Sequence, residues 1–297
     1  MSRDLGDQVV LITGASTGIG LALARRLLQR EKRLRLVLTA REESLPRFAA
    51  AGIEADRRVM VWPLDVTVDA QRRAAIAAVS QRWGGVDVLV NNAGVAYRSV
   101  LEHVREDERL EQMAINFLAP IELVRLVLPR MRTRRAGRIL QVSSVGGMMA
   151  MPTMAIYSAS KFALEGATEA LWYEVRPWNV RVTLIEPGFI RSEGVLHTRY
   201  TRDSQRAEQR PDSGYHHHYV AMRGFIERLM ARSWATPESV ARRMHRCMTM
   251  RRPPLRYQVT ADAHFFSLLR RLLPRGVYHR VLYAALPGIR KWGRPAG

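Results

Sequence analysis

The sequence is poor in cysteine and lysine. Its 297 residues contain one cysteine, Cys247, and only three of its 47 basic residues are lysines. A single cysteine excludes an intramolecular disulfide and is compatible with a reducing compartment. The longest uncharged stretch, residues 139–160, contains a proline, two glycines, a glutamine and four serines, which excludes a membrane span there. The segment that precedes the first apolar run, residues 1–8, is short and polar, so we expect no secretory signal.

Positive charge, in contrast, is present in excess. The 47 basic residues face 27 acidic ones, which gives a formal net charge of +20. Residues 1–190 hold 26 basic and 20 acidic side chains, whereas residues 191–297 hold 21 and 7, so the last third is the basic part. Such a surface attracts nucleic acid, anionic lipid or an acidic partner, although arginine on solvated helix faces explains it equally well.

Composition and periodicity predict one α/β domain over residues 1–297. The chain is 47% hydrophobic and 25% charged, and no linker rich in Pro, Gly or Ser divides it. Short apolar runs predict strands buried on both faces, as in a parallel sheet, at residues 9–13, 34–39, 59–64, 86–90, 138–142 and 180–185. Helical segments alternate with them at residues 18–30, 68–83, 107–132 and 155–175. This alternation predicts a doubly wound parallel sheet with helices on both faces.

The pattern changes after Pro187. Residues 193–235 are polar, arginine-rich and weakly periodic. The sequence then predicts a helix over 237–250, a last strand over 255–260, and two amphipathic segments over 264–273 and 277–286.

A glycine-rich turn joins the first predicted strand to the first helix. It reads Thr13-Gly14-Ala15-Ser16-Thr17-Gly18-Ile19-Gly20. Glycine at such a turn lets backbone N–H groups and the helix N-terminus approach a pyrophosphate, because it has no Cβ to collide with the ligand. The spacing G-x-x-x-G-x-G differs from G-x-G-x-x-G, and a tight turn without a ligand could use the same residues.

Ser144, Tyr157 and Lys161 form the second informative group. Tyr157 and Lys161 are four residues apart in a predicted helix, so they share one face with Cβ atoms about 5–6 Å apart. A free phenol, with a pKa of about 10, is a poor base near neutrality, and a neighbouring ammonium group favours its ionised form. Ser144 ends a predicted strand. The Tyr–Lys spacing alone also fits a packed tyrosine beside a solvated lysine, but together with the glycine turn it indicates acid/base chemistry.

With these motifs the sequence resembles the short-chain dehydrogenases/reductases. The resemblance covers about residues 8–192 and rests on five separated motifs in the family's order: residues 13–20, Asn91-Asn92-Ala93-Gly94, Asn116, the Ser144, Tyr157 and Lys161 set, and Pro187-Gly188. It implies a Rossmann-like fold and an NAD(P)(H)-dependent alcohol dehydrogenase or carbonyl reductase. Residues 193–250 would then form a substrate loop and lid, and residues 255–297 the last strand and an amphipathic extension.

The resemblance also implies roles for individual residues. Tyr157 would be the general acid/base, Ser144 would hydrogen-bond the substrate oxygen, and Lys161 would hold the nicotinamide ribose and tune Tyr157. Asn116 would anchor a water for proton exchange, and Asp65 would contact the adenine. The implied cofactor-binding residues are Gly14, Ser16, Thr17, Gly18, Ile19, Gly20, Arg41, Asp65, Val66, Asn92, Ala93, Gly94, Tyr157, Lys161, Pro187, Gly188, Ile190 and Ser192. Ser192 stands where the family commonly has threonine, and it keeps the hydroxyl.

The end of the second predicted strand indicates the cofactor. NAD-preferring sites place an acidic residue there to bind the ribose hydroxyls, whereas an arginine accommodates the 2′-phosphate of NADP. This chain has Arg41 at that position. We therefore expect NADP(H), with NAD(H) as the alternative. Thr17 occupies a position that is basic in many NADP-preferring relatives, Glu42 and Glu43 follow Arg41 directly, and a solvated surface arginine is the alternative interpretation of Arg41.

The last third indicates an apolar substrate. Phe225, Ile226, Leu229 and Met230 give a helix an apolar face that either lines a pocket or covers the core. Residues 264–273 and 277–286 carry arginines beside apolar positions, as in a membrane-surface helix or a terminal helix docked on its own domain. This C-terminus, preceded by Pro254-Leu255-Arg256-Tyr257, is similar to that of the steroid and retinoid branch of the family, including 17β-hydroxysteroid enzymes. The likeness implies a lipophilic secondary alcohol or ketone of steroid, retinoid or fatty type.

Two other functions stay open at this point. One is a reductase of 3-oxoacyl chains on an acidic carrier protein, and the other is a non-catalytic, cofactor-sensing protein that docks through its basic third. The resemblance implies a homodimer or homotetramer, located in the cytoplasm or peripherally at a membrane, with nucleic acid a minor candidate partner. No metal is expected, because the consecutive His216, His217 and His218 do not share a helix face and hydride transfer in the family needs none.

Overall fold

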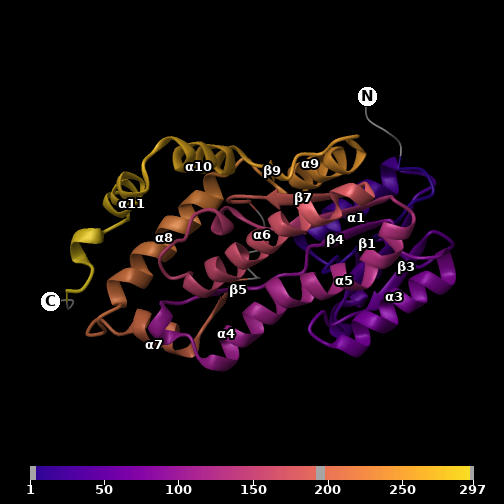
Figure 1. The fold of residues 1–297 in the computed structure, drawn as a ribbon. Helices are drawn as coiled ribbons and strands as arrows, with labels where there is room; N and C mark the ends of the chain where they lie inside the picture. The colour runs from indigo at the N-terminus through magenta and orange to yellow at the C-terminus, as the bar shows by residue number, and fades with distance from the viewer. Residues whose placement is uncertain (1–4, 192–197, 295–297) are drawn as a thin grey trace.

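A seven-stranded sheet forms the centre of the computed structural model, which describes residues 5–191 and 198–294. All its strand pairs are parallel, and their order is β3-β2-β1-β4-β6-β7-β9 (Figure 1). The strands are β1 (Val9–Ile12), β2 (Arg35–Ala40), β3 (Val59–Pro63), β4 (Val88–Asn91), β6 (Gly137–Val142), β7 (Val180–Glu186) and β9 (Arg256–Gln258). Most of their side chains are buried, as near-continuous apolar runs predict. The predicted doubly wound α/β fold is confirmed.

Helices cover both faces of this sheet. On one face α1 (Gly18–Arg30) packs against α9 (Pro237–Thr249). The other face carries α3 (Asp69–Trp83), α5 (Ala119–Thr133) and α6 (Ala155–Val175). The short helix α2 (Pro46–Ala50) follows β2. Helix α9 therefore belongs to the helical layer of the sheet, whereas the sequence predicted it as part of the lid.

Cys247 lies within this helical layer. It is 1% exposed in α9, among Val240, Met244 and Met248. Burial raises the pKa of its thiol to about 11.

The predicted single helix over 107–132 is interrupted. Helix α4 (Glu106–Met113) passes into a π-helical turn, Ala114–Leu118, which α5 continues. Residues Glu106–Thr133 are long and apolar enough to cross a membrane by length and composition. Core helices also pass that test, and here Leu123 and Val127 are buried against the sheet. We therefore interpret α5 as a helix of the α/β layers, while Leu110 and Leu118, earlier in the same segment, are exposed.

The region predicted as a weakly periodic loop contains regular structure. Strand β8 (Thr198–Tyr200) pairs in parallel with β5 (Ala96–Arg98), and helices α7 (Arg202–Gln209) and α8 (His216–Arg232) follow. In Figure 1 these elements lie at the end of the sheet opposite the N-terminus, where the carboxyl ends of the strands point. The Tyr219 hydroxyl ties α8 to the β5 side, 2.9 Å from Nδ1 of His103 and 3.1 Å from the backbone N of Val100.

The C-terminal extension is two helices, α10 (Ala261–Leu272) and α11 (Arg275–Ala284). The first begins three residues earlier than predicted, because Thr260 caps it by accepting a hydrogen bond from the N–H of Ala263. Apolar residues of both helices pack on the segment after β6: Phe266, Leu269, Leu273, Tyr278 and Leu282 lie against Val145, Met148 and Met149. The extension is therefore docked on its own domain.

Candidate active site

The glycine turn is held against the end of β4 by hydrogen bonds. The Thr13 hydroxyl accepts from the backbone N–H groups of Asn92 and Ala93, both at 3.0 Å. The Asn92 amide donates to the carbonyls of Thr13 and Gly14, both at 2.9 Å. A Cβ on Gly20 would lie 2.6 Å from the Asn92 side chain, so this close approach requires glycine. The two motifs that are far apart in the sequence thus form one unit.

The N-terminus of α1 is open beside this unit. Gly18 has a φ of +53°, and a Cβ built on it would meet no described atom within 4 Å. The first turn of α1, all of it in the described part of the chain, carries no acidic side chain. Free N–H groups without a nearby carboxylate suit a pyrophosphate. The turn therefore fits the phosphates of a dinucleotide.

A cavity lies at the ends of β2 and β3, where the resemblance implies the adenosine end of such a dinucleotide. This cavity, of about 450 Å³, is lined by Arg41 and Asp65 together with Glu42, Glu43, Trp62, Pro63, Gln71 and Ala74. The structure therefore brings the predicted phosphate contact and the predicted adenine contact into one site. Arg41 is exposed, and its Nε lies 3.1 Å from Oε1 of Glu43. Asp65 accepts hydrogen bonds from the backbone and hydroxyl of Thr67 through a single oxygen, Oδ1. Val66 is buried in the core.

Ser144, Tyr157 and Lys161 come together at the carboxyl ends of β6 and β4. Ser144 follows β6, and its hydroxyl accepts a hydrogen bond from the Gly146 N–H at 3.1 Å. A Cβ on Gly146 would lie 2.9 Å from the ring of Tyr157, so glycine lets the serine loop reach the phenol. The Lys161 ammonium lies 5.9 Å from the centre of the Tyr157 ring and donates to the Val142 carbonyl at 2.9 Å.

Burial dominates the ionisation of this group. Burial raises the pKa of the Tyr157 phenol, and a hydrogen bond with Ser144 opposes this effect. The sequence predicted a lowered phenol pKa through Lys161, and the structure does not show that lowering. Burial also lowers the pKa of Lys161 from 10.5 to about 8, against the attraction of Glu165. The phenol is therefore in its protonated form at neutral pH.

Asn116 lies in the π-helical turn, fully buried and close to Lys161. Its Nδ2 donates to the Val95 carbonyl at 2.8 Å and to the Ser160 hydroxyl at 3.0 Å, and its Oδ1 accepts from the Val95 N–H at 2.9 Å. A Cβ on Gly94 would lie 3.3 Å from Oδ1 and 3.8 Å from the Lys161 ammonium. Both amide hydrogens of Asn116 are thus engaged, so a water bound to this side chain would have to use Oδ1.

The loop after β7 is held by the C-terminal extension. The Gly188 N–H donates to the Thr260 hydroxyl at 2.9 Å, and the Phe189 N–H donates to Oδ2 of Asp262 at 2.6 Å. The Pro187 carbonyl accepts from the Val145 N–H at 2.7 Å, which links this loop to the serine loop. Ile190 packs against the α1 side of the core. Ser192 lies outside the described residues.

A buried ionic network behind the catalytic candidates was missed by sequence reasoning. Arg256 on β9 donates to Glu165 at 2.6 Å and to Glu169 at 2.8 Å, and it also pairs with Glu186. Burial, followed by the neighbouring Glu165, raises the pKa of Glu186 to about 7 although Arg256 opposes the shift. Glu165 accepts from the Ser143 hydroxyl at 2.6 Å. The network therefore supports the strand end that carries Ser144.

The comparisons with known proteins agree with this geometry. A family model described as short chain dehydrogenase matches residues 8–203. The chain belongs to the short-chain dehydrogenase family. This membership makes it an oxidoreductase, and it confirms the resemblance found in the sequence. The predicted roles of single residues are not tested by it.

Individual relatives of this short-chain dehydrogenase act on different compounds, by their names. It is 39% identical to the 3-ketodihydrosphingosine reductase of Bacteroides thetaiotaomicron over 181 residues, which are 61% of this chain and 63% of that protein. The alignment thus spans less than two thirds of that relative. Human 17-beta-hydroxysteroid dehydrogenase type 1 is 31% identical over 292 residues, 94% of this chain and 87% of the relative.

A solved structure resembles this short-chain dehydrogenase over nearly its full length. It is a short chain dehydrogenase/reductase from Burkholderia phymatum in complex with NAD, with a TM-score of 0.73 and 25% identity, covering 94% of this chain and 96% of that one. The likeness therefore extends through the lid and most of the C-terminal third.

Among the residues that the structure describes, no three His, Cys, Asp or Glu side chains are arranged to hold a metal ion. His216, His217 and His218 begin α8, where the His218 ring lies 4.2 Å from the Trp292 ring.

Proposed function

We propose that this protein is an NADP(H)-dependent reductase that interconverts a lipophilic ketone and its secondary alcohol. The observation that carries the proposal is the apolar cover over the serine loop. Met148 and Met149 follow Ser144 closely, and Phe266 and Leu269 of α10 pack on them. A substrate whose oxygen reaches Ser144 and Tyr157 would place its carbon skeleton beside these side chains, which suits a steroid, retinoid or fatty compound.

The residues divide the chemistry of reduction between them. When bound, a reduced nicotinamide would supply the hydride for the carbonyl carbon. Tyr157, protonated at neutral pH because burial raises its pKa, donates its phenolic proton to the carbonyl oxygen. Ser144 donates a hydrogen bond to the same oxygen as negative charge develops on it. Lys161 holds the ribose and, while protonated, favours the phenolate that results.

Arg41 supports the choice of NADP(H). It lines the cavity at the adenosine end, opposite Asp65. A guanidinium group binds a 2′-phosphate through two parallel hydrogen bonds, and the NAD-type acid is replaced here by this arginine. The Glu43 carboxylate, 3.1 Å away, competes with the phosphate for the guanidinium. NAD(H) is therefore the alternative cofactor, and turnover with NADH should be measured alongside turnover with NADPH.

The test is turnover. Purified protein should oxidise NADPH with hydrophobic ketones of the three classes, and Tyr157→Phe should reduce kcat by at least about 10³-fold with little change in NADPH binding. The matched control is Tyr173→Phe, a change to an exposed tyrosine on the same helix. Full activity of Tyr157→Phe would overturn the proposal. Faster reduction of a carrier-linked 3-oxoacyl chain than of its free form would favour a carrier-protein reductase instead.

A homodimer or homotetramer is the expected assembly. Leu110 and Leu118 on the α4–α5 segment and Phe162 and Tyr173 on α6 are exposed, although large apolar side chains are usually covered. These helices are the ones that the family resemblance implies at subunit contacts. Leu118→Glu should therefore shift the mass measured by light scattering from dimer to monomer. A monomeric native protein would overturn this part.

We also propose that α10 and α11 contact an anionic membrane surface. Phe265, Leu268 and Leu272 of α10 are 58%, 55% and 68% exposed, whereas Phe266 and Leu269 pack inward. Arg270 and Arg271 lie among them. An exposed apolar face flanked by arginines favours acidic lipid headgroups.

Vesicle sedimentation tests this contact. The protein should sediment with vesicles containing phosphatidylglycerol and much less with pure phosphatidylcholine. Leu268→Ser combined with Leu272→Ser should weaken the binding, and the control Leu101→Ser, at another exposed leucine, should not. Equal binding by all forms would contradict a role for α10.

A further inference from the structure

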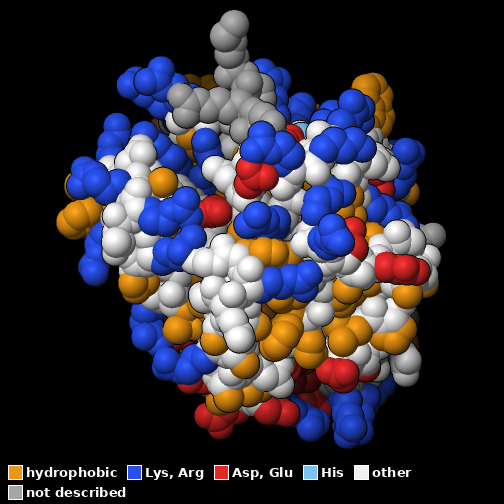
Figure 2. All heavy atoms as spheres, turned by 90° about the vertical axis from the view of Figure 1, so that its right-hand side faces the viewer, with side chains coloured by type: hydrophobic (Ala, Val, Ile, Leu, Met, Phe, Trp, Pro, Cys, Tyr) orange, Lys and Arg blue, Asp and Glu red, His pale blue; other side chains and the backbone are white. Residues whose placement is uncertain are grey.

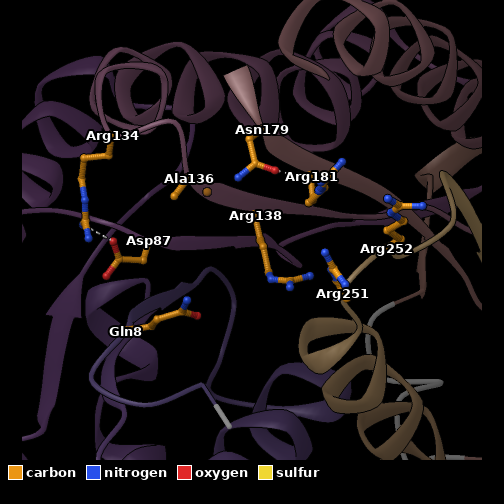
Figure 3. A pocket seen from close by; sticks show the side chains of 10 residues that line it. Gln8, Asp87, Arg134, Ala136, Arg138, Asn179, Arg181, Arg251 and Arg252 are labelled. Atoms are coloured by element: carbon orange, nitrogen blue, oxygen red, sulfur yellow. Dashed lines mark hydrogen bonds and ion pairs between the residues drawn. The ribbon is translucent and has the colours of Figure 1, made fainter. Parts of the chain in front are cut away.

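A second cavity lies at the amino ends of the central strands. The catalytic candidates lie at the other end of the same strands, the carboxyl end. Its volume is about 390 Å³, within the usual range of small-molecule sites. The residues that line it come from the starts of β1, β4, β6 and β7 and from the turn after α9. They are Gln8, Asp87, Arg134, Ala136, Gly137, Arg138, Asn179, Arg181, Arg251 and Arg252 (Figure 3).

The charge of this cavity is strongly one-sided. Five arginines and a single aspartate line it, which is a formal net charge of +4. Figure 2, which looks onto the N-terminal side of the molecule in Figure 1, shows basic side chains over much of that face and few acidic ones. The positive charge is therefore concentrated in a cavity as well as spread over the surface.

Some of these arginines have a structural function. Arg134 forms an ion pair with Asp87 at 2.5 Å, and Arg138 donates to the Met250 carbonyl at 2.7 Å, at the end of α9. The first contact neutralises a carboxylate and the second satisfies a carbonyl at a helix end, so these contacts explain part of the cluster.

The same explanation does not extend to Arg181, Arg251 and Arg252. Within residues 5–191 and 198–294, no carboxylate lies within 4.0 Å of any of the three guanidinium groups. The Arg181 guanidinium donates a hydrogen bond to the uncharged Asn179 side chain at 2.8 Å. The sole acidic lining residue, Asp87, is already paired with Arg134.

Like charges face one another across neighbouring strands at this cavity. Arg138 and Arg181 are register partners on β6 and β7, so their side chains leave the sheet next to each other. Like charges directly opposite in a sheet are destabilising. In Figure 3 the Arg251 side chain reaches toward Arg138 from the other wall. An anion with two or more negative charges would offset this repulsion.

We propose that this cavity binds a small phosphorylated ligand carrying at least two negative charges. Guanidinium groups match phosphate oxygens in pairs, and the walls offer three that no carboxylate occupies. A cavity of about 390 Å³ suits a compact phosphorylated compound better than a nucleic acid, whose backbone would need a continuous groove or stripe. The site is separate from the nicotinamide site and does not depend on the proposed reaction.

Inorganic pyrophosphate is the probe for the test. Calorimetric titration at physiological salt, on protein saturated with NADPH so that the glycine turn is occupied, should show one pyrophosphate per chain. Arg251→Gln combined with Arg252→Gln should raise the dissociation constant at least about tenfold, because each charge-assisted hydrogen bond contributes about 1.5–3 kcal/mol. The KM for NADPH and kcat should stay unchanged in this variant.

The control is Arg228→Gln combined with Arg232→Gln, which removes the same charge from exposed positions on α8. Its pyrophosphate affinity should equal that of the native protein. An equal loss in both double variants, or no saturable binding to the native protein, would overturn the proposal. Tighter binding of duplex DNA than of pyrophosphate, lost in the Arg251 and Arg252 variant, would also overturn it in favour of a nucleic-acid surface.

Discussion

Asp262, at the start of α10, accepts a hydrogen bond from the backbone N–H of Phe189 at 2.6 Å, in the loop after β7. The adjoining Gly188 N–H is held by Thr260, the residue that caps the same helix. The C-terminal extension therefore fixes the loop that the family resemblance places beside the nicotinamide, while its other residues cover the serine loop. The loop after β7 and the serine loop are thus joined through one helix.

This contact predicts that Asp262→Ala weakens cofactor binding. Loss of a hydrogen bond to a carboxylate costs about 1.5–3 kcal/mol, so the KM for NADPH should rise roughly 10-fold or more. Steady-state kinetics with varied NADPH measure this change. The control is Asp212→Ala, at an exposed aspartate paired with Arg210, which should leave the KM as it is. An unchanged KM in Asp262→Ala would show that the loop holds its shape without α10.

The adenosine-end cavity predicts opposite effects for two neighbouring residues. Arg41→Ala should raise the KM for NADPH about tenfold and leave that for NADH nearly unchanged, because only NADPH carries the 2′-phosphate. Glu43→Gln should lower the KM for NADPH, since the carboxylate 3.1 Å from Arg41 competes with that phosphate. Initial rates with both cofactors provide the measurement. Parallel changes for NADPH and NADH in Arg41→Ala would mean that Arg41 does not contact the phosphate.

The ionisation of Lys161 predicts the pH dependence of reduction. Burial lowers the pKa of Lys161 to about 8, so its positive charge is lost as pH rises through that value. The raised pKa of Tyr157 keeps the phenol protonated over the same range. The kcat/KM for the ketone should therefore fall above about pH 8. In Lys161→Arg, whose guanidinium stays charged, the remaining activity should not show this fall. A fall at the same pH in that variant would assign the ionisation to another group.

Glu186 predicts a pH dependence of stability. Its folded-state pKa of about 7 exceeds the ordinary value of 4.5, so the folded chain holds this proton more tightly than the unfolded chain. This carboxyl makes its complete contribution to the free energy of unfolding below about pH 4.5. The contribution is lost as pH rises through about 7. We expect Glu186→Gln to remove this pH-dependent loss of stability. The loss amounts to up to about 3 kcal/mol, at 1.36 kcal/mol per pKa unit.

Denaturant unfolding at pH 4.5, 6 and 7.5 measures the effect of Glu186→Gln. Glu169→Gln is the control, because Glu169 contacts the same Arg256 from the exposed side of the network. The control should keep the native pH dependence. An identical slope in native protein and in Glu186→Gln would show that this carboxyl is not the titrating group.

The first two thirds of the fold were predictable because their signals are local. Buried parallel strands are continuous apolar runs, and glycines at Gly14 and Gly20 are required by close backbone approaches next to β1. The predicted site residues Ser144, Tyr157 and Lys161 come together because the family motif fixes their spacing on one strand end and one helix.

Other features depend on contacts between distant segments, which periodicity does not report. Strand β8 is three residues long and pairs with β5 about a hundred residues earlier, so neither has a pattern of its own. Arg256 is one arginine among many until the sheet places it beside Glu165 and Glu186. The π-helical turn at Asn116 keeps the apolar spacing of a helix, so the sequence predicted one uninterrupted helix. The polar Asn116 inside this apolar segment was the available signal of the π-helical turn in the sequence.

Because Cys247 is buried, the reactivity of its thiol reports local opening of the protein around α9. A thiol with a pKa near 11, on α9 and beside Thr183 of β7, is both sheltered and mostly unionised at neutral pH, and thiol reagents attack the ionised form. Labelling therefore requires α9 to separate from the sheet. Since the sequence has no second cysteine, the rate of labelling measures that separation directly, without an engineered probe.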